Sequence, residues 1–200
     1  MDAVSVIPMR RSSLPQPEKI QQLLAAGRAV AEGFLRDNGQ VPPLMLCFSE
    51  EGLVLHSATS TSHPQVKDDF AGACRLLARA NRATGMVLVL EAWARLAPVG
   101  GTIDTDIRPS TASDRIEIVS LNAEIPGHGY LAMHEIQRDK DGKFSALGVD
   151  RGMDAADMQG RFAGILPKTS PSDIEVEVAK KVLRGFGINP DGTRINPMWN

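Results

Sequence analysis

Residues 85–95, Gly-Met-Val-Leu-Val-Leu-Glu-Ala-Trp-Ala-Arg, decide the fold of this chain. Positions 86–90 are all apolar, which is typical of a central strand that is covered on both faces of its sheet. The preceding residues 65–84 predict an amphipathic helix, with an apolar stripe that consists of Val66, Phe70, Ala73, Leu77 and Ala80. A helix that leads directly into a buried strand indicates the centre of a folded domain.

Further elements are predicted around this centre. A first helix is expected over 17–36, where apolar and small residues recur at helical spacing and Asn38-Gly39 supplies a left-handed stop. Turn residues separate the other strands, a hairpin of 41–48 with 53–56 and a meander of 116–125, 130–138 and 143–149. The expected fold class is α+β: a mainly antiparallel sheet of about five or six strands, in the order β-β-α-β-β-β-β, packed by the N-terminal and central helices and followed by a C-terminal helix.

The turns of the meander predict a strand register. If Ile125 pairs with Tyr130, then Leu121 pairs with His134 and Glu117 with Arg138, which brings opposite charges together. One face of this hairpin is then apolar. The other face is expected to be solvated, and it carries Ser120, Asn122, Glu124, Glu135 and Gln137.

The chain divides into three parts by composition. Residues 1–16 contain several prolines and Arg10-Arg11 and are expected to form a flexible N-terminal arm. Residues 17–150 are expected to form the α+β core domain, and residues 151–200 a C-terminal extension with one or two helices. A short helix is expected within 154–164 and another from Ser172, where Ser-Asp-Ile-Glu has the form of a capping box, although the alternation of 174–178 also fits a strand.

Composition restricts the function classes. The chain has 200 residues, a net charge of −2 and a pI of about 6.1. Nucleic-acid binders usually carry a basic excess, so the charge argues against a nucleic-acid partner. The longest apolar run, 86–90, is far too short to span a bilayer, so no membrane association is expected.

Two cysteines indicate the redox environment. Cys47 lies in an apolar run and Cys74 beside the apolar stripe of the predicted central helix, so both are predicted to be packed thiols. No signal peptide is recognised at the start of the sequence, and the expected compartment is the cytoplasm.

The polarity change at the end of the central strand marks the candidate binding site. From Glu91 onward, Glu91, Trp93 and Arg95 point to one side of the strand, and a long polar loop over 98–115 follows. A tryptophan between opposite charges suits a recognition patch. The alternative is that Trp93 packs under a helix with the charges at its rim.

The remaining polar motifs indicate turns or core positions. Of the histidines, His134 is expected in the core, bound to a backbone carbonyl, and His128 in a turn. His56 and His63 are seven residues apart, a spacing that does not match a metal-binding pair. Asp139-Lys140-Asp141-Gly142 lacks the later ligands of a calcium loop and predicts a tight turn. No metal site and no cofactor are expected, and no catalytic residue is identified.

One resemblance accompanies these patterns. Gly-Met-Val-Leu-Val-Leu-Glu-Ala-Trp at 85–93, followed by Pro109-Ser110 and by Asp-Arg-Ile-Glu at 114–117, resembles a pattern in a family of uncharacterised bacterial and phage proteins. The resemblance covers about residues 66–144. It implies a bacterial or mobile-element origin and carries no activity.

Three functional hypotheses follow. The first is a non-enzymatic interaction or regulatory protein that binds another protein or a second copy of itself. The second is a hydrolase with a polar site formed by Glu91, His134 and the loop with Asp104 and Asp106. The third is nucleic-acid binding through Arg75, Arg79 and Arg82 on the solvated side of the central helix, together with Arg10-Arg11.

Overall fold

A computed structural model describes residues 17–58, 63–95, 106–154 and 161–195. The predicted N-terminal arm, residues 1–16, lies outside the described residues. Residues 98–105 of the long loop that was predicted at 98–115 also lie outside them, including Asp104.

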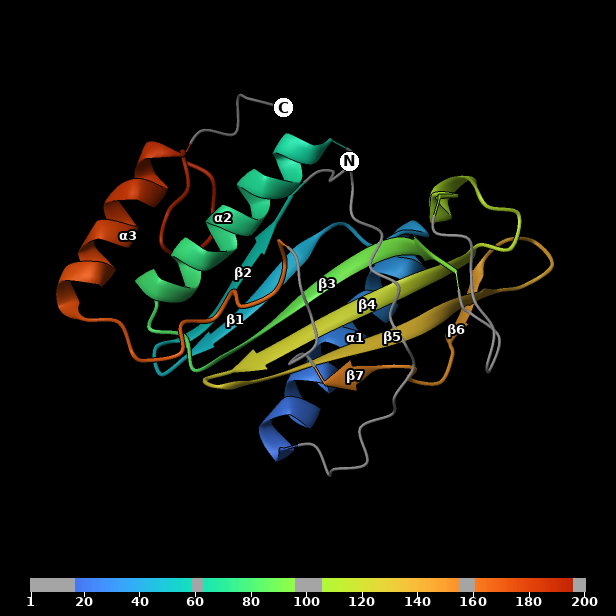
Figure 1. Ribbon diagram of the computed structural model, residues 1–200, viewed down its shortest axis with the longest axis horizontal. Coiled ribbons are helices and arrows are strands. Elements are labelled where there is room, and N and C mark those ends of the chain that lie inside the picture. Colours follow the sequence, from blue (N-terminus) through green and yellow to red (C-terminus); the bar gives the residue numbers. More distant parts are fainter. Residues whose placement is uncertain (1–16, 59–62, 96–105, 155–160, 196–200) are drawn as a thin grey trace.

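The described chain forms an antiparallel sheet with three α-helices (Figure 1). The sheet order is β2-β1-β3-β4-β5-β6, and a short strand, β7, pairs with β5. The elements are α1 (Glu18–Asn38), β1 (Leu44–Ser49), β2 (Gly52–Ser57), α2 (Pro64–Ala80), β3 (Gly85–Ala94), the 3-10 turn η1 (Pro109–Thr111), β4 (Ile116–Ile125), β5 (His128–Arg138), β6 (Phe144–Leu147), β7 (Met153–Asp154) and α3 (Asp173–Gly185). This arrangement confirms the predicted α+β fold class.

The two longer helices cover opposite faces of the sheet, with β3 between them (Figure 1). Val87 and Val89 of β3 pack in the cluster that contains the buried residues of α1, and Met86 and Leu88 pack in the cluster beneath α2. All four side chains are fully buried. The apolar run was predicted to be covered on both faces, and that prediction is confirmed.

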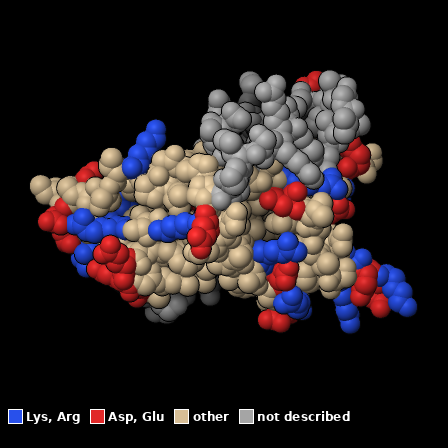
Figure 2. Space-filling view, turned by 90° about the horizontal axis from the view of Figure 1, so that it is seen from below, with Lys and Arg blue, Asp and Glu red and all other residues tan. Residues whose placement is uncertain are grey.

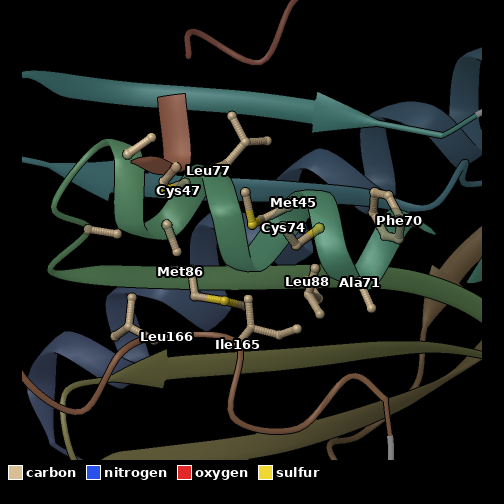
Figure 3. Close-up of a cluster of buried hydrophobic side chains, with 14 of the residues drawn as sticks. Met45, Cys47, Phe70, Ala71, Cys74, Leu77, Met86, Leu88, Ile165 and Leu166 are labelled. Carbon is tan, nitrogen blue, oxygen red and sulfur yellow. The ribbon is translucent and has the colours of Figure 1, made fainter. Parts of the chain in front are cut away.

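Sulfur-containing side chains fill part of the core beneath α2 (Figure 3). Met45, Cys47, Cys74 and Met86 come together there from β1, α2 and β3. Burial raises the pKa of the Cys47 thiol to about 12, and it also raises the pKa of Cys74. Both thiols are free and buried, which confirms that they are packed. Such thiols behave as small apolar groups.

α3 lies on the outer side of α2 (Figure 1). Its residues Val176, Ala179 and Leu183 are buried, and the last two join the core cluster beneath α2. Ser172 and Glu175 form the predicted capping box, and the hydrogen bonds from Ser172 lower the pKa of Glu175. The cap satisfies backbone donors at the start of a helix, so residues 174–178 are helical and the strand alternative is wrong.

The segment 161–168 covers the sheet beside α2. Ile165 and Leu166 pack into the same core cluster (Figure 3). Arg161 forms an ion pair with Asp68 at 3.2 Å and donates to the Pro64 carbonyl at 3.0 Å. The predicted short helix over 154–164 is not formed in the described part of that range, because residues 161–164 are turns.

The β4–β5 hairpin differs from the predicted register by two residues. Ile125 pairs with His128 and Leu121 with Ala132, because the turn consists of Pro126 and Gly127 alone. Gly127 has a φ of 77°, the conformation that glycine supplies at the second position of a turn that begins with proline. A shift of two residues preserves the faces, so the predicted apolar face is correct. Arg138 still reaches Glu117, at 2.8 Å, across the diagonal.

The opposite face of this hairpin was predicted to be solvated, and this is wrong for two residues. Asn122 and Glu124 are buried. The segment 161–168 causes this burial, since Asn122 donates to the Phe162 carbonyl at 2.7 Å and Glu124 accepts the Leu166 N–H at 2.8 Å.

One glycine sets the distance between α1 and the sheet. A Cβ added to Gly27 would lie 2.9 Å from a methyl carbon of Val87 and 3.4 Å from Leu121. A Cβ added to Gly33, in the same helix, would meet nothing within 4 Å.

We expect Gly27→Ala to lower the free energy of unfolding by about 1–3 kcal/mol through overpacking against a β-branched side chain. Gly33→Ala is expected to raise it by about 0.5–1 kcal/mol.

Urea denaturation followed by circular dichroism measures both variants. Equal effects of the two substitutions would contradict the close approach of α1 to β3.

Candidate functional site

The three residues predicted as a binding patch lie at the end of β3, on the side of the sheet that faces α1. Trp93 is 43% exposed, and the Arg115 guanidinium carbon lies 4.4 Å from the centre of its ring. Arg95 forms a two-point ion pair with Asp114, at 2.7 and 3.1 Å. Stacking by an arginine leaves part of the indole open to solvent, so Trp93 is not packed beneath a helix.

Glu91 belongs to a charged group that connects the end of α1 to the sheet. Its carboxylate accepts the Val41 N–H at 2.8 Å. Burial raises the pKa of Glu91, and nearby Glu117 adds to this effect, while the Val41 hydrogen bond and Arg138 oppose it. Arg138 donates to both oxygens of Glu117 and to the Gly39 carbonyl. These contacts satisfy Glu91 within the fold, which leaves Trp93 as the exposed part of the patch.

The pKa of Glu91 predicts a pH-dependent stability. Because the folded-state pKa lies above the value of 4.5 for a free glutamate, the favourable contribution of its proton is complete below that pH and is lost as the pH rises through the folded pKa. The side-chain oxygen that Glu91→Gln introduces can still accept the Val41 N–H but carries no charge. We therefore expect the stability of Glu91→Gln relative to the wild type to be higher at pH 7 than at pH 4.5. Solvent screening keeps this change below about 1 kcal/mol.

Chemical denaturation of the wild type and the variant at several pH values tests this expectation. Glu51→Gln, at an exposed turn position, is the matched control. A difference between wild type and Glu91→Gln that does not vary with pH would contradict the assignment.

The residues of the hydrolase hypothesis lie in one row of the sheet but do not meet. Glu91 and His134 each pair with Val119, so two strand spacings, about 10 Å, separate their backbones. His134 is buried, and its Nδ1 lies 3.0 Å from the Gly148 carbonyl, as predicted for a core histidine. Direct proton transfer requires about 2.6–3.2 Å, so the row is not arranged for acid–base chemistry. Asp106 is exposed.

Two of the three arginines predicted on the central helix make internal connections: Arg75 in α2 and Arg82, which lies just beyond its end. Arg75 donates to the carbonyls of Arg161 and Ala163, at 2.6 and 3.2 Å. Arg82 pairs with Asp173 and donates to the Pro171 carbonyl, which joins the end of α2 to the start of α3. Arg75 is half-buried, so the predicted solvated stripe is wrong for this residue, whereas Arg79 and Arg82 are exposed as predicted.

Charges of both signs are interspersed over the face drawn in Figure 2, without a continuous basic region on the part that is described. This distribution gives little support to polyanion binding on that face.

The outer face of α3 is a surface that sequence reasoning did not identify. Four apolar residues recur every fourth position along it, and we call them the α3 stripe: Ile174, Val178, Val182 and Phe186. Ile174 is 78% exposed, Val178 55% and Phe186 66%. The available signal was that 172–186 holds more large apolar residues than the inner face of one helix can bury.

Charges are segregated along the same helix. The acidic residues Asp173, Glu175 and Glu177 lie in its first half, and Lys180, Lys181 and Arg184 lie in its second half. This order suits the helix dipole. It also makes the helix electrostatically complementary to a second copy that runs in the opposite direction.

Comparison of the chain with protein-family models, with curated proteins and with solved structures gave no match. In the part of the chain that the structure describes, no helix combines the length and the apolar character needed to cross a bilayer.

Proposed function

We propose that this protein is a non-enzymatic interaction module that associates with a second copy of itself through the α3 stripe. The observation that carries the proposal is the row of four exposed apolar side chains on a helix whose opposite face is already buried in the core. Exposed apolar groups gathered in this way favour association.

The spacing of the stripe suits helix-to-helix packing. Side chains four residues apart form a ridge that is inclined to the helix axis, and two such ridges interdigitate at a crossing angle of about −50°. A two-fold axis between Val178 and Val182 would pair each with the other in the partner copy. The ends of the stripe, Ile174 and Phe186, would then meet in the same way.

Charge supports an antiparallel arrangement of the two copies. With the helices reversed, Glu177 of one copy faces the half of the other copy that carries Lys181 and Arg184. A parallel pair would place like charges together. A contact confined to one helix face is smaller than a standard interface of about 1,200–2,000 Å². We therefore expect a dissociation constant in the micromolar range.

Neither of the other two functions is supported as well. Glu91 and His134 are held apart by two strand spacings and are bound to backbone groups. Arg75 and Arg82 are engaged within the fold. An interaction role requires none of these residues to act in chemistry or in polyanion binding.

A charge placed in the stripe tests self-association. Val178→Glu would bury a carboxylate at the centre of the apolar contact, and we expect it to weaken the dimer by at least about 100-fold, which corresponds to roughly 3 kcal/mol. Sedimentation velocity over a range of concentrations measures the change. Val149→Glu is the control, because Val149 is 69% exposed and lies outside α3.

A charge exchange distinguishes the antiparallel pair from other contacts. Glu177→Lys and Lys181→Glu should each weaken association, and the double variant should restore it because the complementarity returns in both copies. A wild-type protein that stays monomeric up to about 1 mM would overturn the proposal, because a micromolar dissociation constant gives mostly dimer at that concentration.

A further inference from the structure

A cavity of about 610 Å³ opens beside α2, away from the outer face of α3. Three pieces of chain form its walls: the turn of the β4–β5 hairpin, the segment 163–168, and the side of α2 that carries Arg75 and Arg79. Its volume falls within the range of small-molecule sites, about 300–1,000 Å³.

Two glycines with positive φ lie in the walls of this cavity. Gly127 and Gly164 have φ values of 77° and 61°, which other residues adopt only with strain. A Cβ at either position would meet no atom within 4 Å. No described atom therefore covers the side-chain position at either glycine.

A buried carboxylate contributes to the lining. Glu124 is only 6% exposed, and its oxygens accept from the Leu166 N–H at 2.8 Å and from the Asn122 side-chain amide at 3.2 Å. Asn122 also donates to the Phe162 carbonyl, so its nitrogen faces two acceptors and its oxygen must face away from them. That buried oxygen accepts no hydrogen bond. Burial of Asn122 and Glu124 with an unsatisfied oxygen lowers the stability of the fold, so core packing alone does not explain this polar pair.

Basic side chains outnumber the carboxylate in the lining of the cavity. Arg75, Arg79 and Lys168 all line the cavity together with Glu124 and His128. Arg75 is engaged with backbone carbonyls. Within the described ranges, Arg79 and Lys168 form no ion pair and donate no side-chain hydrogen bond, although Arg79 helps to lower the pKa of Glu175. Two basic side chains are thus available to a ligand that enters the cavity.

We propose that this cavity binds a small phosphomonoester that also carries an amino group. The anionic group pairs with Arg79 and Lys168, since charge-assisted hydrogen bonds are the stronger kind. The amino group donates to Glu124, whose carboxylate would otherwise repel an anion. This binding site is separate from the self-association proposed for the α3 stripe.

O-phosphoethanolamine is the probe, because it carries a phosphate and an ammonium group on a short chain. Backbone amide signals of Gly127, Gly129 and Gly164 report on the cavity in a nuclear magnetic resonance titration of the full chain. The amides of Gly33 and Gly142 serve as remote references. We expect saturable shifts at the first three positions only.

Variants separate the two halves of the recognition. Arg79→Gln and Lys168→Gln should each weaken O-phosphoethanolamine by about tenfold or more, the loss typical of a charged hydrogen bond. Lys140→Gln, an exposed lysine in another turn, is the control. Glu124→Gln should weaken O-phosphoethanolamine about tenfold, while the binding of propyl phosphate, which lacks the amine, should not weaken.

If the three glycine amides do not shift up to about 10 mM probe, ten times a weak dissociation constant of 1 mM, no such site exists. Equal affinity of wild type, Arg79→Gln and Lys168→Gln would also overturn the proposal. Arg79 and Lys168 are exposed, so these two variants test binding even if Glu124→Gln fails to fold. Val178→Glu should bind the probe as the wild type does, which distinguishes this site from the α3 stripe.

Discussion

The burial of β3 between two helices is the constraint on which the rest of the structure depends. Residues 86–89 have no exposed side chain, so each face of this strand requires its own cover. α1 supplies one cover and α2 the other, and the close approach of α1 requires glycine at position 27. Burial of apolar area is the main favourable term in folding. Because β3 packs against α1 on one face and against α2 on the other, this single strand joins the two helical layers.

The same constraint explains why polar groups gather at the edges of the two layers. α2 lies over β1 and β3 and leaves β4 to be covered by the segment 161–168 (Figure 1). That cover is backbone-rich, so β4 offers it Asn122 and Glu124 as hydrogen-bonding partners in place of apolar side chains. The cavity lies next to this polar contact. At the other end of β3, beyond the cover of α1, the strands carry the paired charges of Glu91, Glu117 and Arg138 around the exposed Trp93.

One face of α3 is buried in the core, and its opposite face is exposed. Its inner residues complete the core beneath α2, and Arg82 and Asp173 connect the two helices at one end. The outer stripe is not needed for this packing. These four exposed apolar residues, on a helix that has already buried its other face, are the basis of the proposed self-association.

By itself, the sequence determined the fold class, the approximate positions of the main helices and strands, the two-sided burial of β3, the packed thiols and the core role of His134. Apolar periodicity and turn residues show which side chains of a segment must be buried, and both are properties of residues that are close together in the sequence. The predicted register of the β4–β5 hairpin was wrong by two residues. Residues 126–129 fit more than one kind of turn, and a shift of two residues leaves every side chain on the same face of the sheet, so the apolar pattern does not distinguish the two registers.

Only the tertiary structure decided which helix covers which face, that Asn122 and Glu124 are buried, and that α3 exposes a second apolar stripe. A polar residue on a strand appears solvated until a distant segment of the chain packs over it, and the segment 161–168 is about forty residues away from Asn122 and Glu124. Burial of a polar group depends on such long-range packing, which periodicity does not record.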